Sequence, residues 1–276
     1  MQRALVLGGG GSTGVAWETG LIAGLAELGV DLSTADMFVG TSAGAIVTAQ
    51  LSTGVPIAEL FAGQTSAVIA EELTGSLGVG GILRFMVTGA WWGDHQRGRA
   101  WLGRAALRAS TPPEAERRPI IEQRLPVHDW PSRPLRLTAV DAESGEFVTF
   151  DAGSGVPLVD AVAASCAVPT VWAPVTINGR RYVDGGVRSL ANVDAAAGCD
   201  RLVVLSPRIA ALRRGDRPDA QAATLGVPHV VISADRTAQA TMGANPMNPA
   251  YRVPAARAGF EQAARVVDQV RGVWAS

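Results

Sequence analysis

The sequence predicts an α/β fold with a mostly parallel central sheet, and three observations support this. A short apolar run at residues 3–7 ends in glycines, which is typical of a buried strand, and helical spacing follows from Val15 to Leu28. A second strand at 37–39 and a second helix at 43–51 repeat the unit. Strands joined through a helix pair in parallel. With 47% hydrophobic and 18% charged residues, the 276-residue chain can bury a substantial core.

The remaining elements follow from turn signals and apolar patterning. Residues 56–134 are helical and irregular in pattern and rich in tryptophan and arginine, so we expect a helical cap or insertion there. No repeat or linker is visible, which indicates a single domain over residues 1–276. Ser144-Gly145 and Asn178-Gly179 are turn dipeptides, and Pro157 suits a helix start. The expected later elements are strands at 135–140 and 146–150, a helix at 157–165, hairpin strands at 171–177 and 181–183, strands at 202–205 and 229–232, and a closing helix at 255–273.

Composition excludes several kinds of chemistry. The chain contains no lysine, since all 24 of its basic residues are arginine, and this excludes Schiff-base chemistry, a Walker-type lysine and a serine–lysine dyad. A net charge of −1 gives no basic field for nucleic acid, so we expect no nucleic-acid partner. Two cysteines and three histidines argue against a structural zinc site or a disulfide framework.

The sequence predicts a cytoplasmic protein without a membrane span. The first apolar run is too short for a signal peptide. Two longer uncharged runs, at 37–58 and 161–179, are interrupted by polar residues or prolines, which favours buried core segments. The insertion suits either a small cap that packs its tryptophans inward or a lid that touches a membrane surface peripherally.

A glycine loop follows the first strand and admits two interpretations. Gly9-Gly10-Gly11-Ser12-Thr13-Gly14 matches the G-x-G-x-x-G pattern of dinucleotide-binding folds. That fold needs an acidic residue after the second strand, but Asp36 precedes the strand, and Val15 stands where a phosphate-binding lysine would be required. The second interpretation is an oxyanion hole, because glycines allow consecutive amides to point into one cavity beside a helix N-terminus.

A candidate nucleophile lies between the second strand and the second helix. Gly40-Thr41-Ser42-Ala43-Gly44 is a G-x-S-x-G pentapeptide, whose glycines permit the tight turn that exposes a serine hydroxyl. Parallel neighbouring strands bring this turn and the glycine loop to the same edge of the sheet. The amide of Ala43 would then face the same cavity as those of Gly10 and Gly11.

Asp184 is the best-placed candidate base. His229 lies at the start of a strand, at the wrong end, while His95 and His128 fall in the insertion without a motif. Asp184-Gly185-Gly186 follows a short strand, and its glycines allow a sharp turn that aims the carboxylate at the sheet edge. An aspartate bonded directly to a serine acts as a general base if burial raises its pKa. An ordinary turn remains the simpler interpretation of this tripeptide taken alone.

Together the three motifs resemble the patatin-like phospholipase family. That family has a glycine-rich oxyanion loop, a G-x-S-x-G elbow and a later D-G-[GA], here Gly9 to Gly14, Gly40 to Gly44 and Asp184-Gly185-Gly186 in the same order. The segment 164–169 is also similar to the one that precedes the family's aspartate. The family's loop usually carries arginine before its last glycine, whereas this chain has Thr13. That difference leaves acyl hydrolysis a firmer expectation than a phospholipid substrate.

The resemblance implies a three-layer α/β/α sandwich and a serine acyl hydrolase that cleaves lipid or long-chain esters. Ser42 is the implied nucleophile, Asp184 its proton acceptor, and Gly10, Gly11 and Ala43 the oxyanion hole, without metal or cofactor. Two alternatives remain open. One is an acyltransferase of related architecture, although such enzymes usually pair serine with histidine. The other is a non-catalytic nucleotide-binding or regulatory protein that uses the glycine loop.

Overall fold

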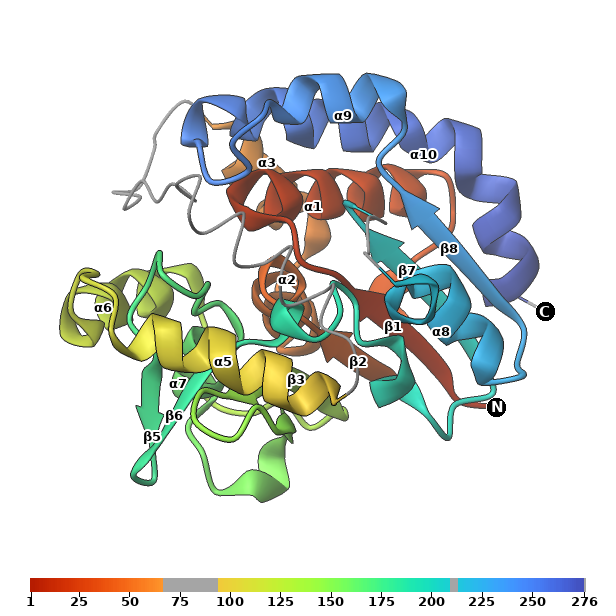
Figure 1. The fold of residues 1–276 in the computed structure, drawn as a ribbon. Coiled ribbons are helices and arrows are strands. Elements are labelled where there is room, and N and C mark those ends of the chain that lie inside the picture. The colour runs from red at the N-terminus through yellow and green to blue at the C-terminus, as the bar shows by residue number, and fades with distance from the viewer. Residues whose placement is uncertain (67–93, 209–212, 276) are drawn as a thin grey trace.

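The structure is a computed structural model that describes residues 1–66, 94–208 and 213–275 (Figure 1). Within these ranges eight strands form one sheet in the order β5-β6-β3-β2-β1-β7-β8, with β4 paired to β3. The strands are β1 (Arg3–Leu7), β2 (Met37–Gly40), β3 (Leu135–Asp141), β4 (Phe147–Phe150), β5 (Val175–Ile177), β6 (Arg180–Asp184), β7 (Arg201–Ser206) and β8 (His229–Ser233).

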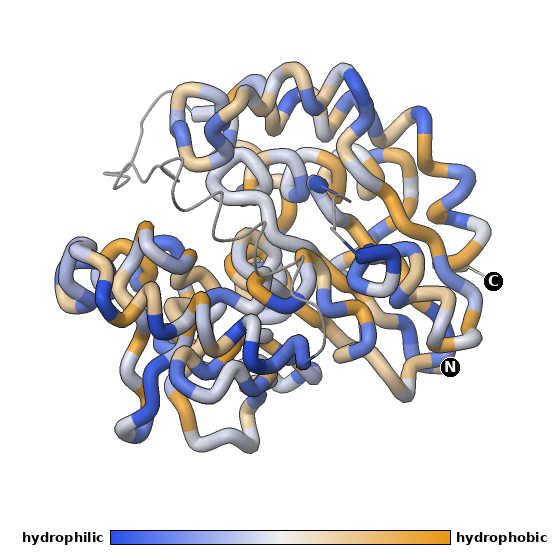
Figure 2. Tube along the Cα trace, viewed as in Figure 1, coloured by the Kyte–Doolittle hydropathy of each residue, from blue (hydrophilic) through white to orange (hydrophobic). Residues whose placement is uncertain are grey.

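The sheet is parallel at its centre and antiparallel at one side. Strands β3, β2, β1, β7 and β8 run parallel, while β4, β5 and β6 are antiparallel additions. The central strands carry continuous apolar runs because both of their faces are covered (Figure 2). On β1, Leu5 and Leu7 belong to one core cluster and Ala4 and Val6 to the other.

Helices cover both faces of the sheet, which confirms the predicted α/β fold (Figure 1). One face packs against α1, α2, α7 and α10, and the other against α5 and α8. The helices described are α1 (Gly11–Glu27), α2 (Ala43–Ser52), α3 (Ile57–Thr65), α5 (His95–Leu107), α6 (Glu114–Arg124), α7 (Leu158–Ser165), α8 (Pro218–Thr224), α9 (Arg236–Met242) and α10 (Arg252–Trp274). None of them is both long and apolar enough to cross a bilayer.

Two element boundaries differ from the predictions by four residues, more than any other. The first helix begins at Gly11 rather than Val15, because Gly14 N–H already bonds to Gly10 C=O and the end of the glycine loop forms the first helical turn. The first hairpin strand begins at Val175 rather than Val171. Residues 171–174 instead follow a turn closed on Val168, and Trp172 is buried in a separate apolar cluster with Met247.

Between residues 56 and 134 the described elements are helices. They are α3, α5 and α6, and Trp101 and Trp130 are both half-buried there. The indole N–H of Trp130 donates to the Val156 carbonyl at 2.7 Å. Trp91 and Trp92, on which the choice between cap and lid also depends, lie outside the described residues.

Helices α1 and α10 cross at glycines, and this contact generates a stability prediction. A Cβ on Gly20 would lie 2.0 Å from the Ala256 carbonyl oxygen. We expect Gly20→Ala to lower the free energy of unfolding by about 1–3 kcal/mol, because one helix must move. Urea denaturation would measure this loss of stability. Gly272→Ala is the matched control, since its Cβ meets open space at an exposed helical position; a control that loses as much stability would contradict the packing argument.

Candidate active site

The backbone at Ser42 is held in an unusual conformation between β2 and α2. Its φ of 54° and ψ of −114° are strained for a residue with a side chain. The turn is possible only because its neighbours are glycines. A Cβ on Gly44 would lie 2.2 Å from the Leu7 carbonyl oxygen, and one on Gly40 2.6 Å from the Cα of Ala45. The pentapeptide is therefore the predicted sharp strand-to-helix turn.

The glycine loop lies directly beside this turn. The Gly8 carbonyl accepts a hydrogen bond from the Gly44 amide at 3.0 Å, and the Gly9 amide donates to the Leu190 carbonyl at 2.7 Å. Among the described residues, no acceptor meets the amides of Gly10, Gly11 or Ala43. Since α1 begins at Gly11 and α2 at Ala43, two helix N-termini present free N–H groups beside Ser42.

Asp184 reaches Ser42 because β6 runs antiparallel to β3. Asp184 pairs with Ala139, two residues beyond Leu137, which pairs with Gly40 at the end of β2. The carboxylate is 3% exposed and accepts from the Gly186 amide at 2.7 Å. Burial raises its pKa to about 6, and hydrogen bonds from the Ser42 side chain and Gly186 limit the rise. The structure thus brings the two predicted side chains together.

Helix α7 holds Ser42 from the other side, through residues to which the sequence analysis gave no role. The Ser42 amide donates to the Ser165 hydroxyl at 3.1 Å, and the Cys166 thiol donates to the Ser42 carbonyl at 3.1 Å. Burial raises the pKa of Cys166 to about 12, so its thiol stays protonated. Both residues therefore fix the backbone of the strained serine.

Asn192 links the two motifs and was also missed. Its buried side-chain amide donates to the Thr41 hydroxyl at 3.2 Å, to the Gly185 carbonyl at 3.1 Å and to the Ser189 carbonyl at 2.8 Å. Thr41 immediately precedes Ser42 and Gly185 immediately follows Asp184. The left-handed backbone of Asn192, with φ of 47°, is a conformation that asparagine adopts readily, but no sequence pattern marks the residue.

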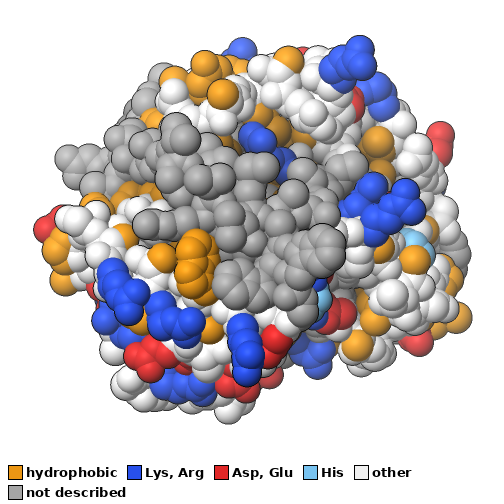
Figure 3. Space-filling view, viewed as in Figure 1, with side chains coloured by type: hydrophobic (Ala, Val, Ile, Leu, Met, Phe, Trp, Pro, Cys, Tyr) orange, Lys and Arg blue, Asp and Glu red, His pale blue; other side chains and the backbone are white. Residues whose placement is uncertain are grey.

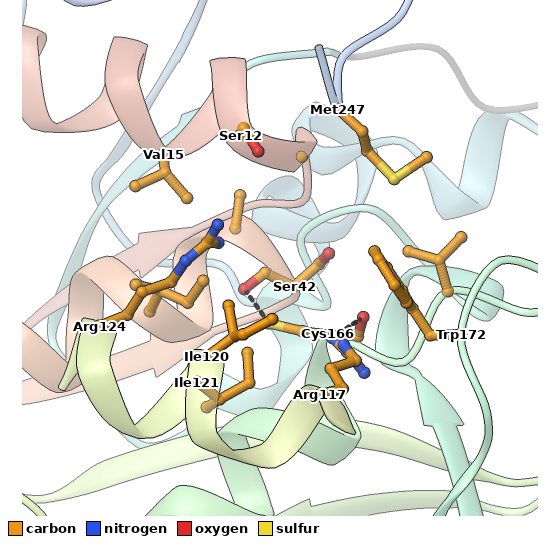
Figure 4. A pocket seen from close by; sticks show the side chains of 14 residues that line it. Ser12, Val15, Ser42, Arg117, Ile120, Ile121, Arg124, Cys166, Trp172 and Met247 are labelled. Carbon is orange, nitrogen blue, oxygen red and sulfur yellow. Dashed lines mark hydrogen bonds between the residues drawn. The ribbon is translucent and has the colours of Figure 1, made fainter. Parts of the chain in front are cut away.

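Two cavities meet at Ser42. The larger, about 560 Å³, is lined by Ser42 and Asp184 and mainly by apolar or glycine residues, among them Gly10, Leu190 and Met247. The smaller, about 70 Å³, lies between α1, α2 and α6 and is lined by Ser12, Ser42, Arg117, Ile120, Arg124 and Trp172 (Figure 4). None of the three histidines lines either cavity. In the described ranges, no three His, Cys, Asp or Glu side chains are grouped to hold a metal ion.

Comparisons with known proteins point to the same family as the sequence motifs. A family model described as patatin-like phospholipase matches residues 5–197. Uncharacterized NTE family proteins of Mycobacterium bovis and Mycobacterium tuberculosis are 30% identical over 220 residues, which cover 79% of this chain and 52% of theirs. The chain therefore spans about half the length of these relatives. The crystal structure of VipD from Legionella pneumophila matches with a TM-score of 0.51 at 14% identity, covering 97% of this chain and 67% of that one, which supports the fold.

We expect Asn192→Asp to lower the free energy of unfolding by about 1–3 kcal/mol, because the replacement cannot donate to Gly185 and Ser189. Chemical denaturation at pH 7.5 would measure the loss. Asn178→Asp is the matched control, since Asn178 lies at an exposed left-handed turn that aspartate tolerates. Equal stability of the two variants would contradict the linking role of Asn192.

The pKa of Asp184 predicts how its replacement affects stability. A folded-state pKa of about 6, above the ordinary value of 3.8, means that the folded protein keeps a proton which the unfolded chain loses. The contribution of Asp184 to the free energy of unfolding therefore falls as pH rises from about 4 to 6. At pH 7.5 we expect Asp184→Asn to be more stable than the wild type by up to about 3 kcal/mol. Thermal melts should show the stability difference between the variant and the wild type shrinking towards zero near pH 4. A variant that is less stable than the wild type at both pH values would contradict this prediction.

Proposed function

Because the chain belongs to the patatin-like phospholipase family, we propose that it is a serine acyl hydrolase that cleaves carboxylic esters of lipids through Ser42 and Asp184. The observation that carries the proposal is that Ser42 and the buried Asp184 line the same cavity, beside amides that lack an acceptor in the described structure. The larger, mostly apolar cavity at Ser42 supports a long acyl chain better than a nucleotide.

The geometry supports a two-step mechanism. The Ser42 hydroxyl transfers its proton to Asp184 as its oxygen attacks the ester carbonyl carbon. The amides of Gly10, Gly11 and Ala43 then donate to the oxyanion of the tetrahedral intermediate. As the carbon–oxygen bond of the ester breaks, the alcohol takes the proton from Asp184 and leaves Ser42 acylated. Asp184 next takes a proton from water as the water oxygen attacks the acyl carbon. It returns this proton to the Ser42 oxygen as the acyl–serine bond breaks, which releases the carboxylic acid and restores free Ser42 and ionised Asp184.

Burial of Asp184 suits this role. A carboxylate with a pKa near its ordinary value would be a weak proton acceptor, whereas a pKa of about 6 makes it a stronger base that is still mostly ionised at neutral pH. The positive ends of α1 and α2 stabilise the negative charge that develops on the oxyanion.

The partners and location that we propose follow from the substrate. A lipid ester would be taken from a membrane surface through peripheral contact with the insertion at 56–134, with no span through the bilayer. Both cysteines are free and buried, which supports work in a reducing compartment such as the cytoplasm.

The first test is labelling by a fluorophosphonate probe combined with hydrolysis of p-nitrophenyl esters of increasing chain length. We expect Ser42→Ala to lose both labelling and turnover, and Asp184→Asn to lose at least about a hundredfold in kcat, since general-base catalysis contributes at least that factor. Ser132→Ala, at an exposed serine that precedes β3, is the control and should behave as the wild type. A wild-type protein that neither labels nor turns over, or an Asp184→Asn variant with full activity, would refute the mechanism.

The pH dependence of the reaction gives a separate test. Only ionised Asp184 accepts the serine proton, so kcat/KM should rise with pH and reach half its maximum near pH 6. Measurements between pH 4.5 and 8.5 in buffers of constant ionic strength would define the profile. A profile that is flat across this range would exclude Asp184 as the titrating base.

A further inference from the structure

The smaller cavity at Ser42 contains a buried positive charge that forms no salt bridge with a described carboxylate. Arg117 is 8% exposed, and its guanidinium donates to the carbonyls of Ala163 at 3.3 Å and Cys166 at 2.6 Å, with the Trp172 ring 5.1 Å from its central carbon. Within the described residues, no ion pair joins it to a carboxylate. Burial lowers the pKa of Arg117 to about 10, so the side chain remains cationic at neutral pH.

Two exposed arginines have a different environment from that of Arg117. On the face in Figure 3, basic and acidic side chains are interspersed. Arg118, the next residue of α6, pairs with Glu122 and Asp160, and Arg180 pairs with Asp141 and Glu146. Arg117 differs from these two arginines because its charge is buried against carbonyl groups and an aromatic ring.

Helix α6 presents a second arginine to the same cavity. Arg117, Ile120, Ile121 and Arg124 follow the i, i+3, i+4, i+7 spacing of one helix face, and all four line the cavity opposite Ser42 (Figure 4). Arg124 is half-buried. The cavity thus has a cation at each end of its α6 wall and two isoleucines between them.

The opposite wall adds further positive potential. It is formed by the first turns of α1 and α2, with Gly11, Ser12 and Ala43 in the lining. No Asp or Glu is among the described lining residues. Thr13, where the resemblance led us to expect arginine, is fully buried and outside this lining, so the charge comes from α6.

We propose that this arginine cavity, defined by Ser12, Arg117 and Arg124, binds an anionic phosphate or carboxylate group carried by the alcohol part of the ester substrate. The inference rests on the proposed function. Ser42 lines both cavities, so an ester positioned at its hydroxyl has room for the acyl chain in the larger, mostly apolar cavity, which Arg208 also lines, and for the alcohol part beside α6. The enzyme should therefore prefer amphiphiles with a net negative charge close to the scissile ester.

The kinetic test compares phosphatidylglycerol, which carries a phosphate beside its esters, with diacylglycerol of identical acyl chains, which carries none, each dispersed in neutral detergent micelles. We expect the wild type to prefer the anionic lipid in kcat/KM, and Arg124→Gln to reduce that preference about tenfold or more, since hydrogen bonds to charged groups contribute factors of this size. Arg124→Lys should retain most of the preference. Arg124 is chosen because Arg117 also caps the C-terminus of α7, where its loss could disturb the fold.

Arg118→Gln is the matched control, because it makes the same change on the same helix at an exposed, ion-paired position. It should leave the ratio of the two kcat/KM values at the wild-type level. A wild type without preference, or an Arg124→Gln variant with an unchanged ratio, would overturn the proposal.

A binding measurement separates this inference from the proposed function, because it needs no turnover. Titration calorimetry would measure the binding of decyl phosphate, decanoate, decyl maltoside and inorganic phosphate to Ser42→Ala. The comparison shows whether binding needs an anionic group, whether phosphate and carboxylate bind equally well, and whether the alkyl chain is required. Tighter binding of either anionic amphiphile than of the maltoside, weakened about tenfold by Arg124→Gln, supports the arginine cavity even if no ester is hydrolysed. Equal binding of the maltoside, or inorganic phosphate binding as tightly as decyl phosphate, would overturn it even if esters are cleaved.

Discussion

The hydrogen bond from the Gly44 amide to the Gly8 carbonyl joins the glycine loop to the serine turn, and the rest of the site is arranged around it. It forms only because β1 and β2 pair in parallel and end at the same level, with Leu7 opposite Gly40. The contact leaves no room for a Cβ on Gly44. Its consequence is that two helices begin side by side, so that the free amides of two N-termini face the strained Ser42.

A second constraint is the burial of charge at the same edge of the sheet. Asp184 and Arg117 are both removed from water. Burial raises the pKa of Asp184 and lowers that of Arg117, and each shift favours the neutral form of the side chain. The loss of hydration destabilises the folded state, but it makes Asp184 a better base and leaves Arg117 able to attract an anion. Asn192, Ser165 and Cys166 hold the backbone around these groups, which is consistent with a preorganised site.

Sequence reasoning succeeded where local chemistry decides the structure. The alternation of strands and helices predicted the parallel centre of the sheet, and the glycines at 40 and 44 predicted a turn that no other residue fits. The hairpin at Asn178-Gly179 was found for the same reason, although its first strand is shorter than predicted because Trp172 packs into another cluster. The family match confirms the resemblance that the motifs suggested.

What the sequence could not predict depends on contacts between distant segments. Ser165 meets Ser42 across 123 residues and Asn192 meets Thr41 across 151, and no local pattern marks either pair. The antiparallel direction of β6, which brings Asp184 to the sheet edge, is likewise a property of the assembled sheet. Helix α6 was predicted only as part of an insertion, because its alignment opposite Ser42 is determined by packing.

The most direct test of this account is a crystal structure of the protein after reaction with a long-chain alkyl fluorophosphonate. Phosphorus should be bonded to the Ser42 hydroxyl oxygen, and the phosphonyl oxygen should lie within hydrogen-bond distance of the Gly10, Gly11 and Ala43 amides. The alkyl chain should occupy the larger cavity beside Leu190. Modification of a different residue, or a phosphonyl oxygen directed away from all three amides, would contradict the central claim.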